Sequence, residues 1–110
     1  MKSQVFYTNL RTGRDKSLLN KISDLAEAAG IKKIVKKNGL TAIKIHFGER
    51  GNTAFIRPLL VRPIVDCVKK AGGKPFLTDS GTLYVGSRGN AVDHLATAVM
   101  NGFAYSVVGA

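Results

Sequence analysis

Two loops with the pattern Gly-x-Arg-Gly-Asn contain the residues of this chain that are best suited to chemistry. The pattern occupies residues 48–52 and recurs at residues 86–90, each time downstream of an apolar run. Glycine permits positive φ angles and lets a ligand approach the main chain, while arginine offers a planar set of N–H donors to carboxylate or phosphate. A single copy would be explained by the ordinary preference of Gly and Asn for turns. Two copies in similar contexts predict an edge that binds anions.

Polar side chains flank both loops and supply further candidates. For proton transfer or metal contact we single out His46, Glu49 and Asp79. The candidate ligand-binding residues are Gly48, Arg50, Gly51, Asn52, Arg57, Ser80, Thr82, Tyr84, Gly86, Arg88 and Asn90. Both signs of charge are present, which favours a small anionic or metal-linked ligand over a long polyanion. The sequence leaves open whether the chain only binds this ligand or also acts on it.

Structural roles compete with these assignments. A lone histidine such as His46 more often makes structural hydrogen bonds than serves as a base. Asp79 directly follows a short apolar run, where catalytic groups of α/β folds often lie, yet a loop-capping aspartate explains the same position. Cys67 flanks an apolar helix face, and we expect it to pack rather than react.

Hydrophobic periodicity predicts the elements that position these residues. Leu18, Ile22 and Leu25 recur at helical spacing, so a helix is expected over residues 16–29 with Asp15 able to cap it. Further helices are expected over residues 59–71 and after the cap Asn90. Four β-rich runs predict strands at residues 4–8, 40–47, 74–78 and 104–108.

Two helical details remain to be decided by the structure. Pro63 either bends the helix over residues 59–71 or marks its start, because an interior proline removes a hydrogen bond. In the helix after Asn90, the stripe of Val92, Leu95 and Val99 is expected to face the core. His94 then points away from the core, towards solvent or another domain.

The element order predicts an α/β fold with a parallel sheet in a three-layer βαβαβαβ arrangement of four strands and three main helices. We expect residues 1–110 to form a single domain. The predicted last strand ends at the C-terminus without a helix to cover it, and an uncovered parallel strand is an aggregation-prone edge. The chain is therefore expected to be part of a larger fold.

Composition narrows the function classes. The chain has 17 Lys and Arg against 7 Asp and Glu, for a formal charge of +10, and a single cysteine. We expect a cytoplasmic protein without a disulfide, a metal cage or a membrane span. Basic charge also suggests nucleic-acid binding through Lys32, Lys33, Lys36 and Lys37. That alternative competes with a short helix whose lysines are merely solvated.

Several motifs resemble one known family. They are His46-Phe47-Gly48-Glu49-Arg50-Gly51-Asn52, the run from Thr82 to Arg88, and Asn90-Ala91-Val92-Asp93-His94-Leu95. They look like domain of unknown function 362, which occurs in iron-sulfur proteins of bacteria and archaea. The resemblance implies a longer domain, of which this chain is either the N-terminal part or a truncated member. It also implies a missing C-terminal region or a ferredoxin-like domain as a partner.

Two features of the chain differ from that family. Many members carry cysteine runs for four-iron four-sulfur clusters, and Cys67 alone cannot supply the four thiolates. The resemblance therefore implies a redox context without a cofactor bound by this chain. In addition, an Asn tends to stand in the family where this sequence has Gly81.

Overall fold

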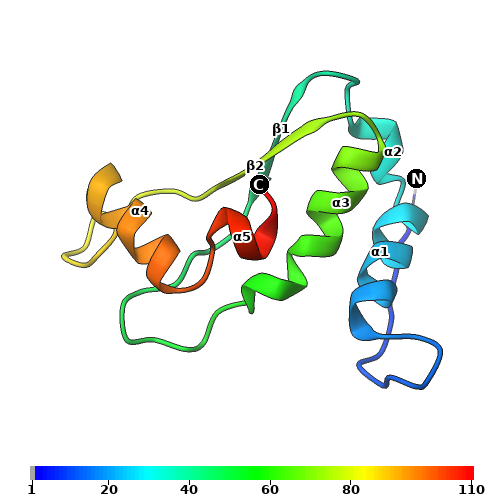
Figure 1. Ribbon diagram of the computed structural model, residues 1–110, viewed down its shortest axis with the longest axis horizontal. Helices are drawn as coiled ribbons and strands as arrows, with labels where there is room; N and C mark the ends of the chain where they lie inside the picture. Colours follow the sequence, from blue (N-terminus) through cyan, green and yellow to red (C-terminus); the bar gives the residue numbers. More distant parts are fainter. Residues whose placement is uncertain (1) are drawn as a thin grey trace.

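The computed structural model describes residues 2–110 and shows a mixed α/β fold (Figure 1). Two parallel strands, β1 (Leu40–Lys44) and β2 (Lys74–Thr78), form the sheet, and Leu40 pairs with Lys74 in register. Five helices accompany them: α1 (Leu18–Ala28), α2 (Ile31–Ile34), α3 (Arg62–Lys70), α4 (Ala91–Met100) and α5 (Tyr105–Val108). A 3₁₀ turn, η1 (Pro58–Leu60), precedes α3.

The predicted central elements are confirmed with shorter limits. Helix α1 begins after Ser17, whose side chain accepts a hydrogen bond from the Asn20 N–H, so Ser17 and not Asp15 is the cap. The helix ends where Gly30 adopts a left-handed conformation, as expected of a glycine just past a helix. Pro63 lies in the first turn of α3 and so marks the start of the helix rather than a bend.

Two predicted strands are wrong. Residues 4–8 form no strand and run outside the sheet, with Val5 and Tyr7 exposed. Residues 104–108 contain the helix α5 in place of a strand. Val108 of this helix is fully buried against α3 and η1, so burial of an apolar side chain outweighs the β preference of a Val-rich run. The four-strand, three-layer arrangement is not what the described residues form.

The core lies between one face of the sheet and helices α3, α4 and α5. Val65 and Val108 are fully buried there, and Phe103 is buried beside them. Ile43 and Leu77 from the two strands pack against them, and Cys67 is buried nearby as a packing residue. The opposite face of β1 is exposed, as its alternating burial pattern shows. No helix within residues 2–110 is long and apolar enough to cross a membrane.

This core brings the ends of the two strands to one rim. The segment after β1 and the segment after β2 both leave the sheet towards α4, which lies at the left in Figure 1. Helix α2 and the lysine-rich segment lie at the other end of the molecule. The candidate residues that follow the strands are therefore brought together beside α4, and the lysine cluster is remote from them.

Candidate functional site

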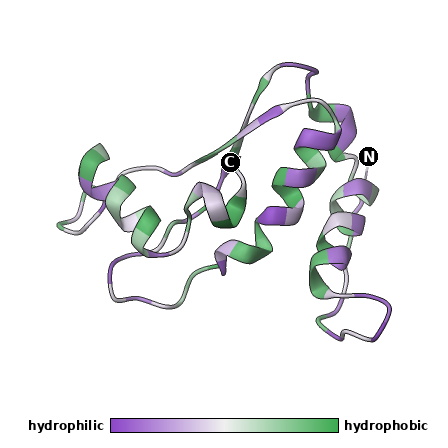
Figure 2. Ribbon diagram, in the orientation of Figure 1, coloured by the Kyte–Doolittle hydropathy of each residue, from purple (hydrophilic) through white to green (hydrophobic). Residues whose placement is uncertain are grey.

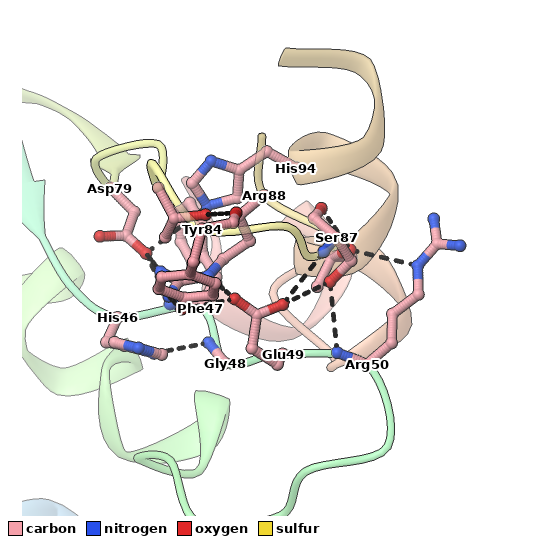
Figure 3. A network of polar contacts seen from close by, with 12 residues as sticks. His46, Phe47, Gly48, Glu49, Arg50, Asp79, Tyr84, Ser87, Arg88 and His94 are labelled. Carbon is pink, nitrogen blue, oxygen red and sulfur yellow. Dashed lines mark hydrogen bonds and ion pairs between the residues drawn. The ribbon is translucent and has the colours of Figure 1, made fainter. Parts of the chain in front are cut away.

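The two Gly-x-Arg-Gly-Asn loops lie in contact at this rim. Residues 48–52 form the first loop, and residues 86–90 form the second loop. The Ser87 hydroxyl donates to Glu49 Oε2 at 2.7 Å, and the Arg50 N–H donates to Ser87 Oγ at 3.4 Å. Figure 3 shows these contacts between loops that are nearly forty residues apart in the sequence. The shared rim that the repeat predicted is therefore present.

Arg88 is the centre of a buried ion network. Its side chain is 5% exposed, and its Nε donates to Glu49 Oε1 at 2.6 Å while Nη1 donates to Asp79 Oδ2 at 3.0 Å. Nη2 donates to the Tyr84 hydroxyl, which itself donates to Glu49. A guanidinium is suited to this role because its fork of donors can satisfy two carboxylates in different directions.

The two carboxylates of the network are ionised. Hydrogen bonds from Arg88 and Ser87 lower the pKa of Glu49 to about 2. For Asp79, burial acts to raise the pKa, but hydrogen bonds from the Phe47 and Ser80 N–H groups and from Lys44 outweigh it and lower the pKa to about 2. Carboxylates stabilised in this way are weak bases near neutral pH. Proton transfer by Glu49 or Asp79 is correspondingly unfavourable.

Helix α4 closes the site with a polar inner face that consists of His94, Thr97 and Asn101. Thr97 is completely buried, and its hydroxyl donates to the Ser87 carbonyl and accepts from Arg50 Nε at 3.2 Å. The Asn101 amide donates to the Phe47 carbonyl at 2.8 Å. Residues three and four apart share a helix face, so this polar face joins both loops to the helix.

His94 corrects one sequence-based expectation. It does not point away from the protein: its ring packs edge-on against Phe47, and its Nε2 lies 3.5 Å from Asp79 Oδ2. The stripe of Val92, Leu95 and Val99 is exposed instead. The helix is rotated in this way because its polar face meets the Arg88 network, while no described element covers the apolar stripe.

The remaining candidate residues lie at the rim or beside it. His46 is exposed, and its Nδ1 accepts the Gly48 N–H at 2.8 Å, which leaves the proton of the neutral ring on Nε2. Asn52 accepts the Ala54 N–H, and Asn90 caps α4 by accepting the Asp93 N–H. Ser80 is exposed and contributes its N–H to Asp79. The exposed or half-exposed candidates without a role in the ion network are Gly51, Arg57, Thr82 and Gly86.

Arg50 differs from Arg88 in its surroundings. Its side chain is exposed, its Nε is bound to Thr97, and its two terminal nitrogens have no hydrogen-bond partner within residues 2–110. Figure 3 shows the guanidinium extending away from the network. Lys44 is also at the rim and pairs with Asp79 Oδ1 at 3.1 Å. Arg50 is therefore the arginine of the two loops that retains free donors.

Sequence reasoning missed Lys44, Thr97 and Asn101 as members of the site. Thr97 and Asn101 had a signal in the sequence: with His94 they form a second stripe along α4 and its C-cap, at spacings of three and four. Because the apolar stripe on the same helix was the stronger pattern, it was taken for the buried face.

The described residues do not fit an iron-sulfur cluster. Such a cluster needs several cysteine thiolates, and Cys67 is the chain's single cysteine, 1% exposed within the core. Among residues 2–110, no group of three or more His, Cys, Asp or Glu side chains is placed to hold a metal ion.

Comparisons with known proteins place the chain in a family. No curated protein and no solved structure matches it. The model of one family, described as Domain of unknown function (DUF362), matches residues 41–110, which is more than half of the chain and contains both loops, Asp79 and α4. The chain belongs to the DUF362 family.

Proposed function

We propose that this chain binds a small anionic ligand at the rim formed by the two loops, with Arg50 as the principal contact. The observation that carries the proposal is the arrangement of Arg50. Its Nε and backbone N–H are bound to Thr97 and Ser87, which positions the guanidinium, and its terminal nitrogens are free among the described residues. A positioned guanidinium with free donors binds carboxylate or phosphate at a low cost in side-chain entropy.

The charge balance of the rim supports an anion. Glu49 and Asp79 would repel it if they were unpaired, but Arg88 binds both and Lys44 pairs with Asp79. Arg50 then remains as uncompensated positive charge. The metal-linked form of the ligand has less support, since the carboxylates that would contact a metal are already engaged by Arg88 and Lys44.

His46 is the group of the rim that best suits proton transfer, should the ligand react. Its Nε2 carries a proton in the neutral tautomer that the Gly48 N–H selects. Glu49 and Asp79, with pKa values of about 2, serve instead to hold Arg88 and the loops. This division assigns the carboxylates a positioning role and leaves binding to Arg50 and His46.

The proposal is tested by an NMR titration of the full chain with inorganic phosphate and pyrophosphate, against sodium chloride at matched ionic strength. We expect the amide signals of residues 48–52 and 79–90 to shift together. Arg50→Gln should weaken binding about tenfold or more, because charge-assisted hydrogen bonds are lost. Arg14→Gln, which removes an exposed arginine from the N-terminal loop, is the matched control and should leave the affinity for both anions unchanged.

Scattered shifts, or equal affinity of the wild type and Arg50→Gln, would refute the anion site.

The alternative of nucleic-acid binding concerns a different surface. Lys32, Lys33, Lys36 and Lys37 are all exposed, and Lys32 is 3.3 Å from Glu27. Nucleic-acid binding by this surface predicts an affinity for RNA or DNA that falls steeply with salt concentration and is not changed by Arg50→Gln.

A further inference from the structure

The chain contains two Asn-Gly pairs, and the structure holds them in different surroundings. One is Asn38-Gly39, in the turn between α2 and β1, and the other is Asn101-Gly102, directly after α4. Asparagine followed by glycine is chemically labile, because glycine has no side chain to hinder attack of its main-chain nitrogen on the asparagine carboxamide. Whether such a pair reacts in a folded protein depends on how its carboxamide is held.

The asparagine after α4 is held in place by tertiary contacts. Asn101 is half-buried, and its Nδ2 donates to the Phe47 carbonyl at 2.8 Å and to the Glu49 carbonyl at 3.4 Å. Nδ2 is the atom that would have to leave, and both bonds retain it. A carboxylate at this position would face the same two carbonyl oxygens, which only accept hydrogen bonds and could not bind it. The rim therefore protects Asn101.

The asparagine of the turn has no such contacts. Asn38 is exposed, and its carboxamide makes no hydrogen bond to any of residues 2–110. Its φ is 60°, in the left-handed region that asparagine adopts more readily than most residues. The glycine N–H groups do not explain the difference, since Gly39 donates to the Lys36 carbonyl and Gly102 to the Val99 carbonyl, both at 3.0 Å. The two pairs therefore differ in the freedom of the carboxamide.

Positive charge surrounds the exposed turn. Lys36 and Lys37 directly precede Asn38, and Lys74 follows on the neighbouring strand; all three lysines are exposed. Figure 2 shows the connection from α2 into β1 largely in the colour of hydrophilic residues. Attack on the carboxamide passes through a deprotonated Gly39 nitrogen and an oxyanion, and nearby cations stabilise both negative charges.

We propose that Asn38 is a site of spontaneous deamidation in the folded protein, while Asn101 is protected. The Gly39 nitrogen loses its proton and forms a bond to Asn38 Cγ. The bond from Cγ to Nδ2 breaks, and Nδ2 leaves as ammonia with the proton that the Gly39 nitrogen lost. Water then opens the resulting succinimide ring at either carbonyl carbon, which gives aspartate or isoaspartate at position 38.

The product changes the lysine-rich end of the molecule and leaves the rim as it is. The new carboxylate removes one unit from the formal charge of +10, within the lysine cluster. Isoaspartate also inserts a carbon atom into the main chain of a turn that is bonded on both sides to the segment before β2. The Asn38 N–H donates to the Gly72 carbonyl at 2.7 Å, and the Lys74 N–H donates to the Gly39 carbonyl at 2.8 Å.

Peptide mapping of the full chain after incubation in mildly alkaline buffer tests the proposal. Trypsin separates the two sites, because residues 38–44 and 89–110 form different fragments. A sample taken before incubation corrects for deamidation during digestion. In the folded chain Asn38 should react at least about tenfold faster than Asn101, and in concentrated urea the two rates should agree within about threefold, because the tertiary contacts are lost.

Cation-exchange chromatography of variants gives an independent readout. The incubated wild type should develop an earlier-eluting form that has lost one positive charge. Asn38→Gly removes the carboxamide and suits a positive φ, so this variant should not develop that form. Asn20→Ser, which replaces an exposed asparagine of α1, is the matched control and should develop it at the wild-type rate.

Equal rates at Asn38 and Asn101 in the folded chain would overturn the proposal. A ratio of the two rates that urea leaves unchanged would show that the tertiary structure does not protect Asn101. Persistence of the early-eluting form in Asn38→Gly would place the loss of charge elsewhere in the chain.

Discussion

Arg50 and Arg88 hold the same place in two five-residue loops of matching sequence, and their surroundings are opposite. Arg88 is buried and binds Glu49, Asp79 and Tyr84. Arg50 is exposed, and its side chain binds only Thr97 among residues 2–110, through Nε. The two loops also differ in backbone conformation. Gly48 and Gly51 of the first loop have positive φ angles, and Gly86 and Gly89 of the second loop do not.

The difference shows that a repeated sequence pattern need not form repeated structure. The first loop is a tight turn closed by a hydrogen bond from the Asn52 N–H to the Glu49 carbonyl. The second loop is part of a longer connection that carries its arginine inwards. One arginine therefore holds the rim together, while the other faces solvent with free donors. The following variants separate these two roles.

Replacement of the buried arginine should have the largest effect. Arg88→Met leaves Asp79 and Glu49 without their partner, and loss of one member of a buried ion pair costs about 3–5 kcal/mol in the free energy of unfolding. Arg50→Met removes one hydrogen bond at the surface and should cost about 1 kcal/mol or less. Urea denaturation of both variants measures the difference. Equal losses would show that the two loops are energetically equivalent.

Alanine at the first glycine of each loop gives the next largest contrast. A Cβ on Gly48 would lie 2.5 Å from Phe55 Cδ1, at a φ of 78°. Left-handed strain and overpacking together should cost about 2–4 kcal/mol. A Cβ on Gly86 meets the Tyr84 ring at 3.3 Å and Glu49 Oε2 at 3.5 Å, and Gly86→Ala should cost well below about 1 kcal/mol. Thermal unfolding of Gly48→Ala and Gly86→Ala distinguishes the two, and a reversed order would contradict this account.

The asparagine that ends each loop predicts a smaller difference. Asn90 accepts the Asp93 N–H as the cap of α4, and Asn90→Ala should cost about 1 kcal/mol. The Asn52 side chain accepts the Ala54 N–H in an exposed turn, so Asn52→Ala should cost about half of that or less. The free energies of unfolding of the two variants, measured side by side, test whether the cap matters more than the turn.

Glu49→Gln should lower stability most at neutral pH, because it removes the charge that pairs with Arg88 and one acceptor oxygen for Ser87. The difference from the wild type should shrink in acid. The pKa of Glu49 is lowered from 4.5 to about 2 on folding, so the unfolded chain binds the proton more readily in that interval. The stabilisation is complete above about pH 4.5 and is lost as the pH falls towards 2.

Unfolding free energies of the wild type and Glu49→Gln, measured between neutral pH and pH 2, test this expectation. Glu49→Gln should decline less steeply in acid than the wild type. The remaining decline should come mainly from Asp79, whose pKa is lowered in the same direction. Arg50→Gln, which leaves both carboxylates paired with Arg88, should keep the wild-type slope. Parallel curves for Glu49→Gln and the wild type would contradict the assignment.

Local patterns predicted the elements whose side chains alternate strongly between two environments. Helix α1, the strands β1 and β2, and the cap at Asn90 were all visible in the sequence. Each depends on residues close together in the chain. The meeting of the two loops was also anticipated, because the carboxyl ends of parallel strands share one edge of a sheet.

The prediction failed where partners distant in the sequence decide the outcome. Residues 4–8 have strand composition but lie outside the sheet, and the Val-rich segment at 105–108 is helical because Val108 fits into the core. Helix α4 carries two stripes, and its orientation was predicted the wrong way round. Only the buried Arg88 network explains why the polar stripe faces inwards.

By itself, the sequence determined the family, the sheet's two strands, the main helices and the proximity of the loops, since all of these follow from local pattern or strand direction. Only the tertiary structure decided which arginine is buried, which face of α4 is exposed and that Glu49 and Asp79 are paired with cations. The physical reason is that a buried charge must be paired, and the pairing partners of Arg88 come from segments far apart in the chain. Equal sequence patterns do not reveal which copy will have those partners.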